Sequence, residues 1–447
     1  MCSEAAACAT PYRGSGAPVG GLYACLSASI NPESGWRKTQ FDVLVASPWA
    51  VRIGIIRLMG WTPPRFFGIN VPAGFHLVWE TALNPKESKM NATARIQKIQ
   101  SCTGVVVGID IAESVFQLCE ADTNWRRLGS HRLSRTQFER WFDNRDVALV
   151  IMEACGMAHH WARWLQRRGI DVELLPPHYV RAYVKRNKTD AADAAALLEA
   201  ARCADIQPVR IKTEEQQALQ ALHRTRSMWM GWRTATINAM RGACREAGLR
   251  VSKGAKAGLA QMAKMIADEQ SAIPALLRNT MRSMLEEVRQ LEVRIDAVEK
   301  ELTTVVQHSE PCKLLQSVPG VGLLTTTAMA AATGGDVTHF KDSRGFACWF
   351  GITPKERSSG HNRKLGRISK QGDTYLRMLL VHGARSVLRA AATAQAQGKP
   401  LDALKRWALQ LQARTCHNKA ACALANKLAR ICYACLRDKV PYQAKMA

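Results

Sequence analysis

The pattern of apolar and polar positions becomes regular near residue 104. The pattern predicts five short β-strands, at residues 105–109, 116–120, 129–133, 148–152 and 171–175. The first and fourth are unbroken apolar runs, which is typical of strands buried on both faces. Helical spacing predicts helices at 136–144 and 158–169, a short helix at 179–184 and an alanine-rich helix beginning near Asp190.

Beyond residue 210 the apolar spacing is helical. Residues 216–249 predict a helix rich in arginine and glutamine, and residues 418–436 predict a packing helix that is alanine-rich on one face. Between these two segments, apolar residues recur at alternating steps of four and three, at Leu277, Met281, Met284, Val288, Leu291, Ile295, Val298, Leu302 and Val305. This heptad seam favours a coiled-coil spacer that also dimerises, and the alternative is an amphipathic helix packed in a bundle.

Residues 1–89 show no sustained period, and Pro63, Pro64, Pro72 and Pro85 interrupt what pattern there is. Their start lacks the basic segment and apolar core of a signal peptide. We expect translation to begin near Met90 and residues 1–89 to be a non-native or disordered extension. The patterns divide the rest into an α/β domain at 90–210, a helical connector at 211–308 and a mainly helical domain at 309–447.

The charge of the chain indicates a polyanionic partner. The 447 residues carry a formal net charge of +25 at pH 7, and residues 90–447 account for +22 of it. Nucleic acid is the natural partner of such a protein. A ribosomal-type or solubilising charge is the alternative, but a hydrophobic content of 47% indicates a folded globular protein. No apolar run is long enough to span a membrane, so we expect a cytoplasmic protein without a membrane partner.

The 14 cysteines are scattered and show paired spacing only at Cys432 and Cys435. We interpret them as reduced thiols of a cytosolic protein. A zinc site built from Cys416, His417, Cys422, Cys432 and Cys435 is the weaker interpretation, because the segment is helical throughout and a single CxxC is weak evidence. Buried helix cysteines explain the pattern better.

Four acidic residues are placed as a metal-dependent nuclease site requires. Asp110 and Glu153 each end a buried strand, whereas Asp190 and Asp193 lie three apart on one face at the start of a helix. Four converging negative charges repel, and two Mg²⁺ ions would relieve that repulsion and suit phosphodiester cleavage. Taken singly, each acid has a simpler explanation as a strand-end, loop or helix-start residue. Their combination favours the metal site, and the order of strands and helices is that of a ribonuclease H-like fold.

The third region holds two candidate phosphate-binding segments. Residues 315–322 (LQSVPGVG) have the form of a helix-hairpin-helix turn, in which Gly320 and Gly322 let backbone N–H groups approach a phosphate. A plain helix–helix turn is the alternative. Further along, Ser358 and Ser359 lie among six basic residues, Arg357, His361, Arg363, Lys364, Arg367 and Lys370. This field suits either a nucleophilic serine or a loop in which serine only donates a hydrogen bond to phosphate.

The ordered motifs resemble one family. The segments that carry the resemblance are GIDIAES, MEACGMAHHWA, NKTDAADAAALLEAA, SVPGVG, FGITPKERSSG, GRISKQGDTYLRMLLVHGAR and NKAACALANKLARI, between about Gly104 and Tyr442. They are similar to the transposases of the IS-one-ten insertion-sequence family, particularly its IS-eleven-eleven branch. Only residues 1–89 fall outside the pattern.

The resemblance implies a DNA recombinase with a RuvC-like DEDD domain, a coiled-coil connector and a carboxy-terminal transposase domain. The four acids would then be Asp110, Glu153, Asp190 and Asp193, acting with Mg²⁺. The serine that precedes a glycine matches Ser359, with Ser358 as the runner-up, and it would form a covalent phosphoserine with DNA. Related enzymes act as tetramers guided by a bridge RNA, with sites composed from two subunits, so a guide RNA and a homodimer or homotetramer are implied.

The sequence therefore predicts a transposase that excises and inserts its own element. One rival is a RuvC-like Holliday-junction or structure-specific nuclease in which the acids hydrolyse DNA and the serine only binds. Another is a nucleic-acid-binding protein whose acids hold structure. A Ser359-dependent protein–DNA adduct distinguishes the first rival, and DNA exchange by Asp110→Ala distinguishes the second.

Overall fold

The computed structural model describes residues 24–30, 37–43, 104–184, 189–203 and 205–444. The chain divides into two compact units, Met1–Phe67 and Gly68–Ala447. In the first unit, strand β1 (Ala24–Ile30) pairs antiparallel with β2 (Arg37–Val43). Sequence reasoning missed this hairpin, because neither segment alternates strongly between apolar and polar residues. The expected start near Met90 lies outside the described residues.

The second unit begins with a five-stranded sheet in the order β5-β4-β3-β6-β7. Its strands are β3 (Val105–Ile111), β4 (Val115–Ala121), β5 (Arg127–Ser134), β6 (Val147–Glu153) and β7 (Asp171–Leu175). The chain forms β3, β4 and β5 as an antiparallel meander, and β6 and β7 then add parallel to β3. All five predicted strands are confirmed, with ends that differ by a few residues.

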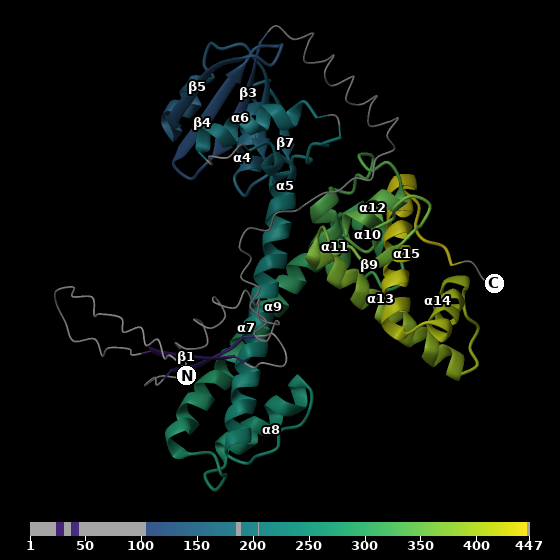
Figure 1. Cartoon of the computed structure of the whole chain (residues 1–447). Coiled ribbons are helices and arrows are strands. Elements are labelled where there is room, and N and C mark those ends of the chain that lie inside the picture. Colours follow the sequence, from purple (N-terminus) through teal and green to yellow (C-terminus); the bar gives the residue numbers. More distant parts are fainter. Residues whose placement is uncertain (1–23, 31–36, 44–103, 185–188, 204, 445–447) are drawn as a thin grey trace, which may run out of the picture. The chain divides into compact units, whose positions relative to one another are not determined.

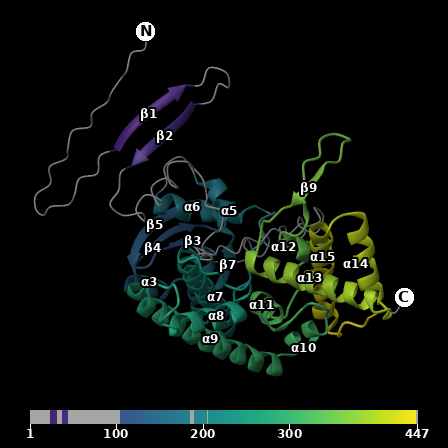
Figure 2. The same cartoon turned by 90° about the horizontal axis from the view of Figure 1, so that it is seen from below.

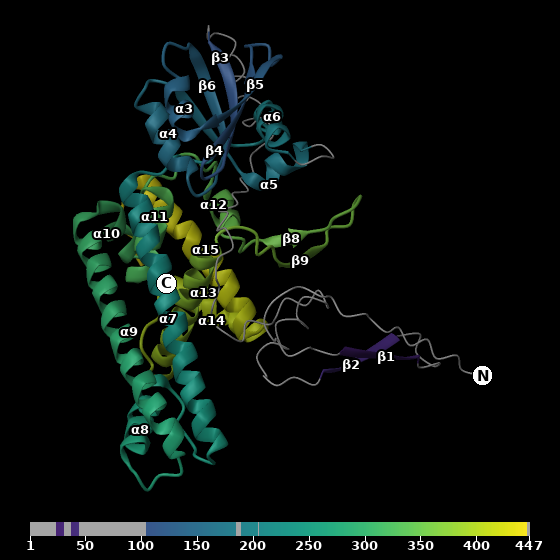
Figure 3. The same cartoon turned by 90° about the vertical axis from the view of Figure 1, so that its left-hand side faces the viewer.

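Helices cover both faces of this sheet. On one face lie α3 (Arg135–Trp141) and α4 (Ala158–Gln166), which pack Phe138 and Trp161 against the strands. On the other face lies α6 (Asp190–Ala201), whose alanines pack against β3, β4 and β6. Figure 3 shows the two groups of helices on opposite sides. A short helix α5 (Pro177–Val180) and a 3₁₀ turn η1 (Arg181–Tyr183) precede α6.

Three helices form the connector (Figure 1), α7 (Glu214–Glu246), α8 (Ala255–Ala267) and α9 (Ala275–His308). The two long helices run antiparallel and are joined by ion pairs from Arg226 to Glu299, at 2.6 Å, and from Arg233 to Glu292. Most of the heptad seam of α9 is buried within this chain, against α7, α8 and α11. This packing matches the bundle alternative, and dimerisation through the seam stays a prediction.

The remaining chain forms a helical domain. Its elements are α10 (Glu310–Gln316), α11 (Leu323–Thr333), α12 (Ser343–Trp349), β8 (Pro354–Glu356), β9 (Leu365–Ile368), α13 (Thr374–Ala396), α14 (Ala403–Arg414) and α15 (His417–Asp438). One apolar core joins these helices, and Cys432 and Cys435 lie buried in it, as the helical pattern predicts. The β8–β9 hairpin projects from the helices (Figure 2). In the described part of the chain, no helix combines the length and apolarity needed to cross a bilayer.

Candidate active site

Two of the predicted acids occupy the ends of adjacent parallel strands. Asp110 lies in β3 and Glu153 ends β6, each directly after the paired residues Ile109 and Met152. Side chains alternate along a strand, so Asp110 shares a face with Val106, and Glu153 shares a face with Ile151. Val106 and Ile151 both pack against α6. Both carboxylates therefore point to the α6 side of the sheet.

The other two acids lie at the start of that helix. Thr189 caps α6 by accepting a hydrogen bond at its Oγ1 from the Ala192 backbone N–H at 3.2 Å, and Asp190 and Asp193 lie in the first turn. A Cβ built on Gly108 would lie 2.5 Å from the Ala194 carbonyl oxygen. The close approach thus occurs two residues before Asp110 on the strand and one residue after Asp193 on the helix. The strand that carries Asp110 therefore contacts the helix that carries Asp190 and Asp193.

Both strand acids act electrostatically on one nearby thiol, that of Cys155. Burial raises the pKa of the Cys155 thiol, and the negative charges of Glu153 and Asp110 raise it further. Each carboxylate therefore lies within electrostatic range of one thiol, although they belong to different strands.

The metal-ligand set expected from the sequence is not assembled in the described residues. No three His, Cys, Asp or Glu side chains among them are arranged to hold one metal ion. The strand register places Asp110 beside Glu153, and the sharing of an ion by these two acids with Asp190 and Asp193 stays a prediction.

The two candidate serines lie in the β8–β9 hairpin and differ in their bonding. Ser358 donates from Oγ to Glu356 Oε1 at 2.7 Å, and the Lys364 backbone N–H donates to Ser358 Oγ at 3.2 Å. Ser359 pairs with Asn362 only through backbone hydrogen bonds, of 3.2 and 3.1 Å. Gly360, with φ +56°, forms the tight turn after it. The Ser358 hydroxyl is thus engaged within the hairpin, whereas the exposed Ser359 makes no side-chain hydrogen bond in the described structure.

The predicted basic residues surround these serines on exposed backbone. The group comprises Arg357, His361, Arg363, Lys364, Arg367 and Lys370, all of them exposed. Glu356 lies among them and contacts Arg363 Nε at 3.3 Å. The hydrogen bond from Ser358 is the main cause that lowers the pKa of Glu356, with the charge of Arg363 contributing. The hairpin therefore presents a positive surface that contains one ionised carboxylate.

Glycines clamp the base of the hairpin. A Cβ on Gly372 would lie 2.0 Å from the Trp349 carbonyl oxygen, and one on Gly351 would lie 1.9 Å from the Gln371 carbonyl oxygen. The Lys370 backbone N–H also donates to the Gly351 carbonyl at 3.0 Å. Because both chain ends of the segment meet here, the hairpin is anchored directly to α12 and to the start of α13.

The predicted helix-hairpin-helix glycines occupy the turn between α10 and α11. Gly320 has φ +77°, and a Cβ there would lie 2.6 Å from the Gly383 carbonyl oxygen of α13. Gly322 caps α11, and a Cβ there would meet nothing within 4 Å. Gly320 is thus needed for helix packing, which agrees with the plain-turn alternative. Phosphate binding by Gly320 and Gly322 stays a prediction.

A set of buried polar residues that sequence reasoning did not identify links the sheet domain to the start of α13. Lys212, 4% exposed, donates its backbone N–H to His159 Nδ1 of α4 at 3.2 Å. Burial lowers the pKa of Lys212 to about 8, while the nearby charge of Asp373 raises it. Asp373 caps α13 by accepting from the Leu376 N–H at 2.9 Å. No motif marks Lys212, because its burial depends on contacts between distant segments.

Two models of known protein families match the chain, one over the sheet domain and first long helix and one over the C-terminal helical domain. The family model described as Transposase (DEDD, IS110) matches residues 107–247, and the model described as Transposase IS116/IS110/IS902 family matches residues 312–399. The first covers the sheet with its four acids and the first long helix. The second covers the hairpin with its two serines.

Individual relatives of the chain are also described as transposases. A probable family 20 transposase of Pseudomonas aeruginosa is 39% identical over 338 residues, which cover 75% of this chain and 98% of the relative. The transposase for insertion sequence element IS1111A of Coxiella burnetii is 37% identical over 338 residues, covering 76% of this chain and 91% of the relative. The transposase for IS1328 of Yersinia enterocolitica is 32% identical over 328 residues, covering 73% and 95%.

An α/β domain with acids at the edge of its sheet, followed by helices and a basic hairpin, is therefore the framework of a DEDD-type transposase. The chain belongs to the IS116/IS110/IS902 family of transposases.

Proposed function

We propose that this transposase cuts and rejoins DNA through a serine intermediate, with Ser359 as the nucleophile. The observation that carries the proposal is the difference between the two serines: Ser358 is held by Glu356, while the Ser359 hydroxyl is exposed at the turn of a basic hairpin. A positive field favours phosphate binding and stabilises the charge that develops on attack. Ser359 is thus the hydroxyl available to a DNA phosphate.

The chemical step balances within the DNA and the serine. Ser359 Oγ forms a bond to phosphorus, the bond from phosphorus to a sugar oxygen breaks, and the serine proton ends on the released sugar hydroxyl. Attack of a sugar hydroxyl on the phosphoserine then rejoins the strand by the reverse exchange. The energy of the phosphodiester is kept in the protein–DNA bond, so the cycle needs no external energy source.

The acids would serve this step through a divalent cation, proposed as Mg²⁺. Asp110, Glu153, Asp190 and Asp193 are the residues that would hold it, since hard cations prefer carboxylate oxygens. When bound, the ion supplies positive charge that stabilises the phosphate during transfer. Two observations support this placement: the register of β3 and β6 sets Asp110 beside Glu153, and α6, which carries Asp190 and Asp193, contacts β3 at Gly108.

The proposal includes the finer expectations of the sequence. These are a RuvC-like fold for the sheet domain, membership of the IS-eleven-eleven branch, action in the cytoplasm on element and target DNA, a structured guide RNA, and a homodimer or homotetramer. The five-stranded sheet supports the first of these expectations, and the relative named for IS1111A supports the second. The proposed boundaries of the three domains remain 90–210, 211–308 and 309–447.

Trapping the protein–DNA adduct tests the proposal. The full chain is incubated with Mg²⁺ and a labelled DNA carrying the junction of its own element, then denatured and run on a gel. We expect a covalent adduct with the natural chain and with Ser358→Ala, and none with Ser359→Ala or Asp110→Ala. Cleavage without an adduct would support the nuclease rival, and unchanged DNA exchange by Asp110→Ala would support the binding rival.

A further inference from the structure

Strand register extends the acidic edge into a row of polar side chains across four strands. Asp110 of β3 pairs with Gln117 of β4, and Gln117 pairs with Arg132 of β5. Glu153 lies next to Asp110 on the other side. Because directly paired residues point to the same face, all four side chains lie on the α6 side. The row runs from two carboxylates, through an amide, to a guanidinium.

The middle of this row is built rigidly. Gln117 is 8% exposed, and its Nε2 donates to Ser130 Oγ at 2.9 Å. Ser130 in turn donates to the Leu118 carbonyl at 3.1 Å. The buried amide thereby fixes the edge strand β5 against β4 at the level of Asp110. Neighbouring strands lie roughly 4.8 Å apart, so Arg132 begins about 10 Å from Asp110.

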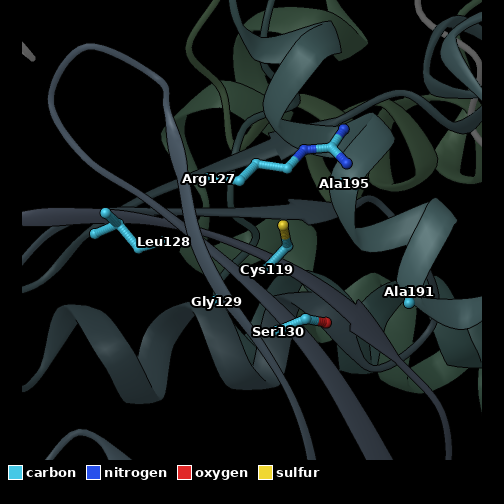
Figure 4. Close-up of a pocket in the computed structure, with 7 residues that line it drawn as sticks. All are labelled: Cys119, Arg127, Leu128, Gly129, Ser130, Ala191 and Ala195. Carbon is cyan, nitrogen blue, oxygen red and sulfur yellow. The ribbon is translucent and has the colours of Figure 1, made fainter.

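A groove runs beside the row, between the edge strand and α6. Its volume is about 310 Å³, and its lining includes Arg127 and Ser130 of β5, Cys119 of β4, and Ala191 and Ala195 of α6. Figure 4 shows the Arg127 side chain reaching toward α6 above the Cys119 thiol. The two alanines of α6 leave this space open, one residue after Asp190 and two after Asp193. The groove thus lies along the same face of the sheet as the row, beside the first turns of α6.

The arginine of the groove, Arg127, and the arginine of the row, Arg132, lack partners on the protein. Within the described structure, neither Arg127 nor Arg132 forms an ion pair or a side-chain hydrogen bond, and both are exposed. The opposite face of the same strands differs, because Glu120 there pairs with His131 at 2.9 Å and with Arg145 at 3.3 Å. Positive charge on β4 and β5 is therefore neutralised on the α3 side and left free on the α6 side.

We infer that the α6 side of β4 and β5 binds the backbone of the DNA strand whose phosphate is handled at the acidic edge, with Arg127 and Arg132 each contacting a phosphate. The inference rests on the proposed function for the identity of that strand. Unpaired arginines beside a groove match the charge of a phosphodiester chain, and arginine binds phosphate through two parallel N–H donors. The position next to Asp110 favours the reacting DNA strand over a guide RNA or an acidic protein segment.

DNA affinity across a salt series tests the inference without requiring catalysis. The full chain is titrated into a fluorescent single-stranded DNA of its element end and into an RNA of the same sequence. We expect Arg127→Gln and Arg132→Gln each to weaken DNA binding about 3- to 10-fold. Each lost phosphate contact should also reduce the slope of log affinity against log salt by roughly 0.7. Arg140→Gln, an exposed arginine of α3 on the opposite face, is the matched control and should change neither quantity.

Three results would overturn the inference. They are unchanged DNA affinity and slope in the double substitution, a loss confined to the RNA, or an equal loss in Arg140→Gln. Failure of the proposed function is read separately, as the absence of a Ser359-dependent adduct, and it leaves the affinity measurement intact. Far-ultraviolet circular dichroism of each variant confirms that the sheet is folded.

Discussion

Gly108 lies against Ala194: a Cβ on the strand residue would be 2.5 Å from the carbonyl oxygen of the helix residue. Strand β3 and helix α6 are therefore in backbone contact beside Asp110 and Asp193. Any side chain at position 108 must move the helix that carries two of the four acids away from the strand that carries another. The acidic edge depends on this glycine as directly as on the acids.

Gly108→Ala should therefore destabilise the sheet domain. Overpacking typically costs about 1–3 kcal/mol, and we expect the β3 amides to exchange hydrogen faster by a corresponding amount and the adduct yield to fall. Gly242→Ala is the control, since a Cβ there meets nothing within 4 Å in helix α7. That substitution should stabilise its helix by roughly 0.5–1 kcal/mol. Unchanged exchange in Gly108→Ala would contradict the contact.

Glu356→Gln tests how the hairpin charge is balanced. Glu356 holds Ser358 and contacts Arg363, so its carboxylate offsets part of the positive surface. The amide retains an oxygen that accepts from Ser358, but it no longer neutralises the arginine. We expect roughly two- to fivefold tighter DNA binding with a steeper salt dependence. Weaker binding would show instead that the carboxylate itself is needed at the interface.

Lys212 and Asp373 are expected to position the hairpin relative to the sheet domain. Asp373 caps α13 one residue after Gly372, where the base of the hairpin is clamped, and burial raises the pKa of its carboxyl while Lys212 lowers it. Lys212→Met keeps the aliphatic stem and removes the charge. We expect amides at 369–376 to exchange at least tenfold faster and adduct formation to slow.

The double substitution Lys212→Met with Asp373→Asn should restore much of this order, because asparagine caps a helix as well as aspartate and needs no cation. Lys300→Met, at an exposed position of α9, is the control. If the amides at 369–376 exchange as fast in the double variant as in Lys212→Met, the faster exchange comes from altered packing of the side chain and not from the loss of its charge.

Acidification should destabilise the contacts of α7 and α4. Burial lowers the pKa of His223 and of His159 to about 4, with nearby cations adding to the effect. His223 lies between Tyr375 Oη, 3.1 Å from Nδ1, and Thr327 Oγ1, 3.0 Å from Nε2. Thr327 already donates to the Leu323 carbonyl at 2.7 Å, so the neutral ring donates to Thr327 and accepts from Tyr375.

An unfolded histidine has a pKa near 6.5, so between about pH 6.5 and 4 the unfolded chain binds protons that these folded histidines do not. Their contribution to stability is complete above pH 6.5 and falls as the pH drops, by roughly 2 kcal/mol for each histidine at pH 5. Denaturant unfolding at pH 7 and pH 5 measures the loss. His223→Gln should reduce it, and an equal loss in that variant would assign it to other groups.

The sequence by itself determined the local elements and the candidate chemistry. Unbroken apolar runs fixed the strands that end in Asp110 and Glu153, because burial on both faces leaves little choice of residue. The position of Asp190 and Asp193 on one face of a helix followed from their spacing of three residues. The setting of the two serines among basic residues followed from composition over a few residues, and family motifs tied these segments to one activity.

The tertiary structure alone decided which surfaces meet. A heptad pattern states that Leu291 and Val298 are buried but not against which partner, and the fold buries them within the same chain. Nothing local separates Gly320, which packs on α13, from a glycine that faces phosphate. The burial of Lys212 and the unpaired charge of Arg127 likewise arise from segments far apart in the chain. Packing and charge pairing depend on every contact in space. The periodicity of a single sequence reflects only residues that are neighbours along the chain.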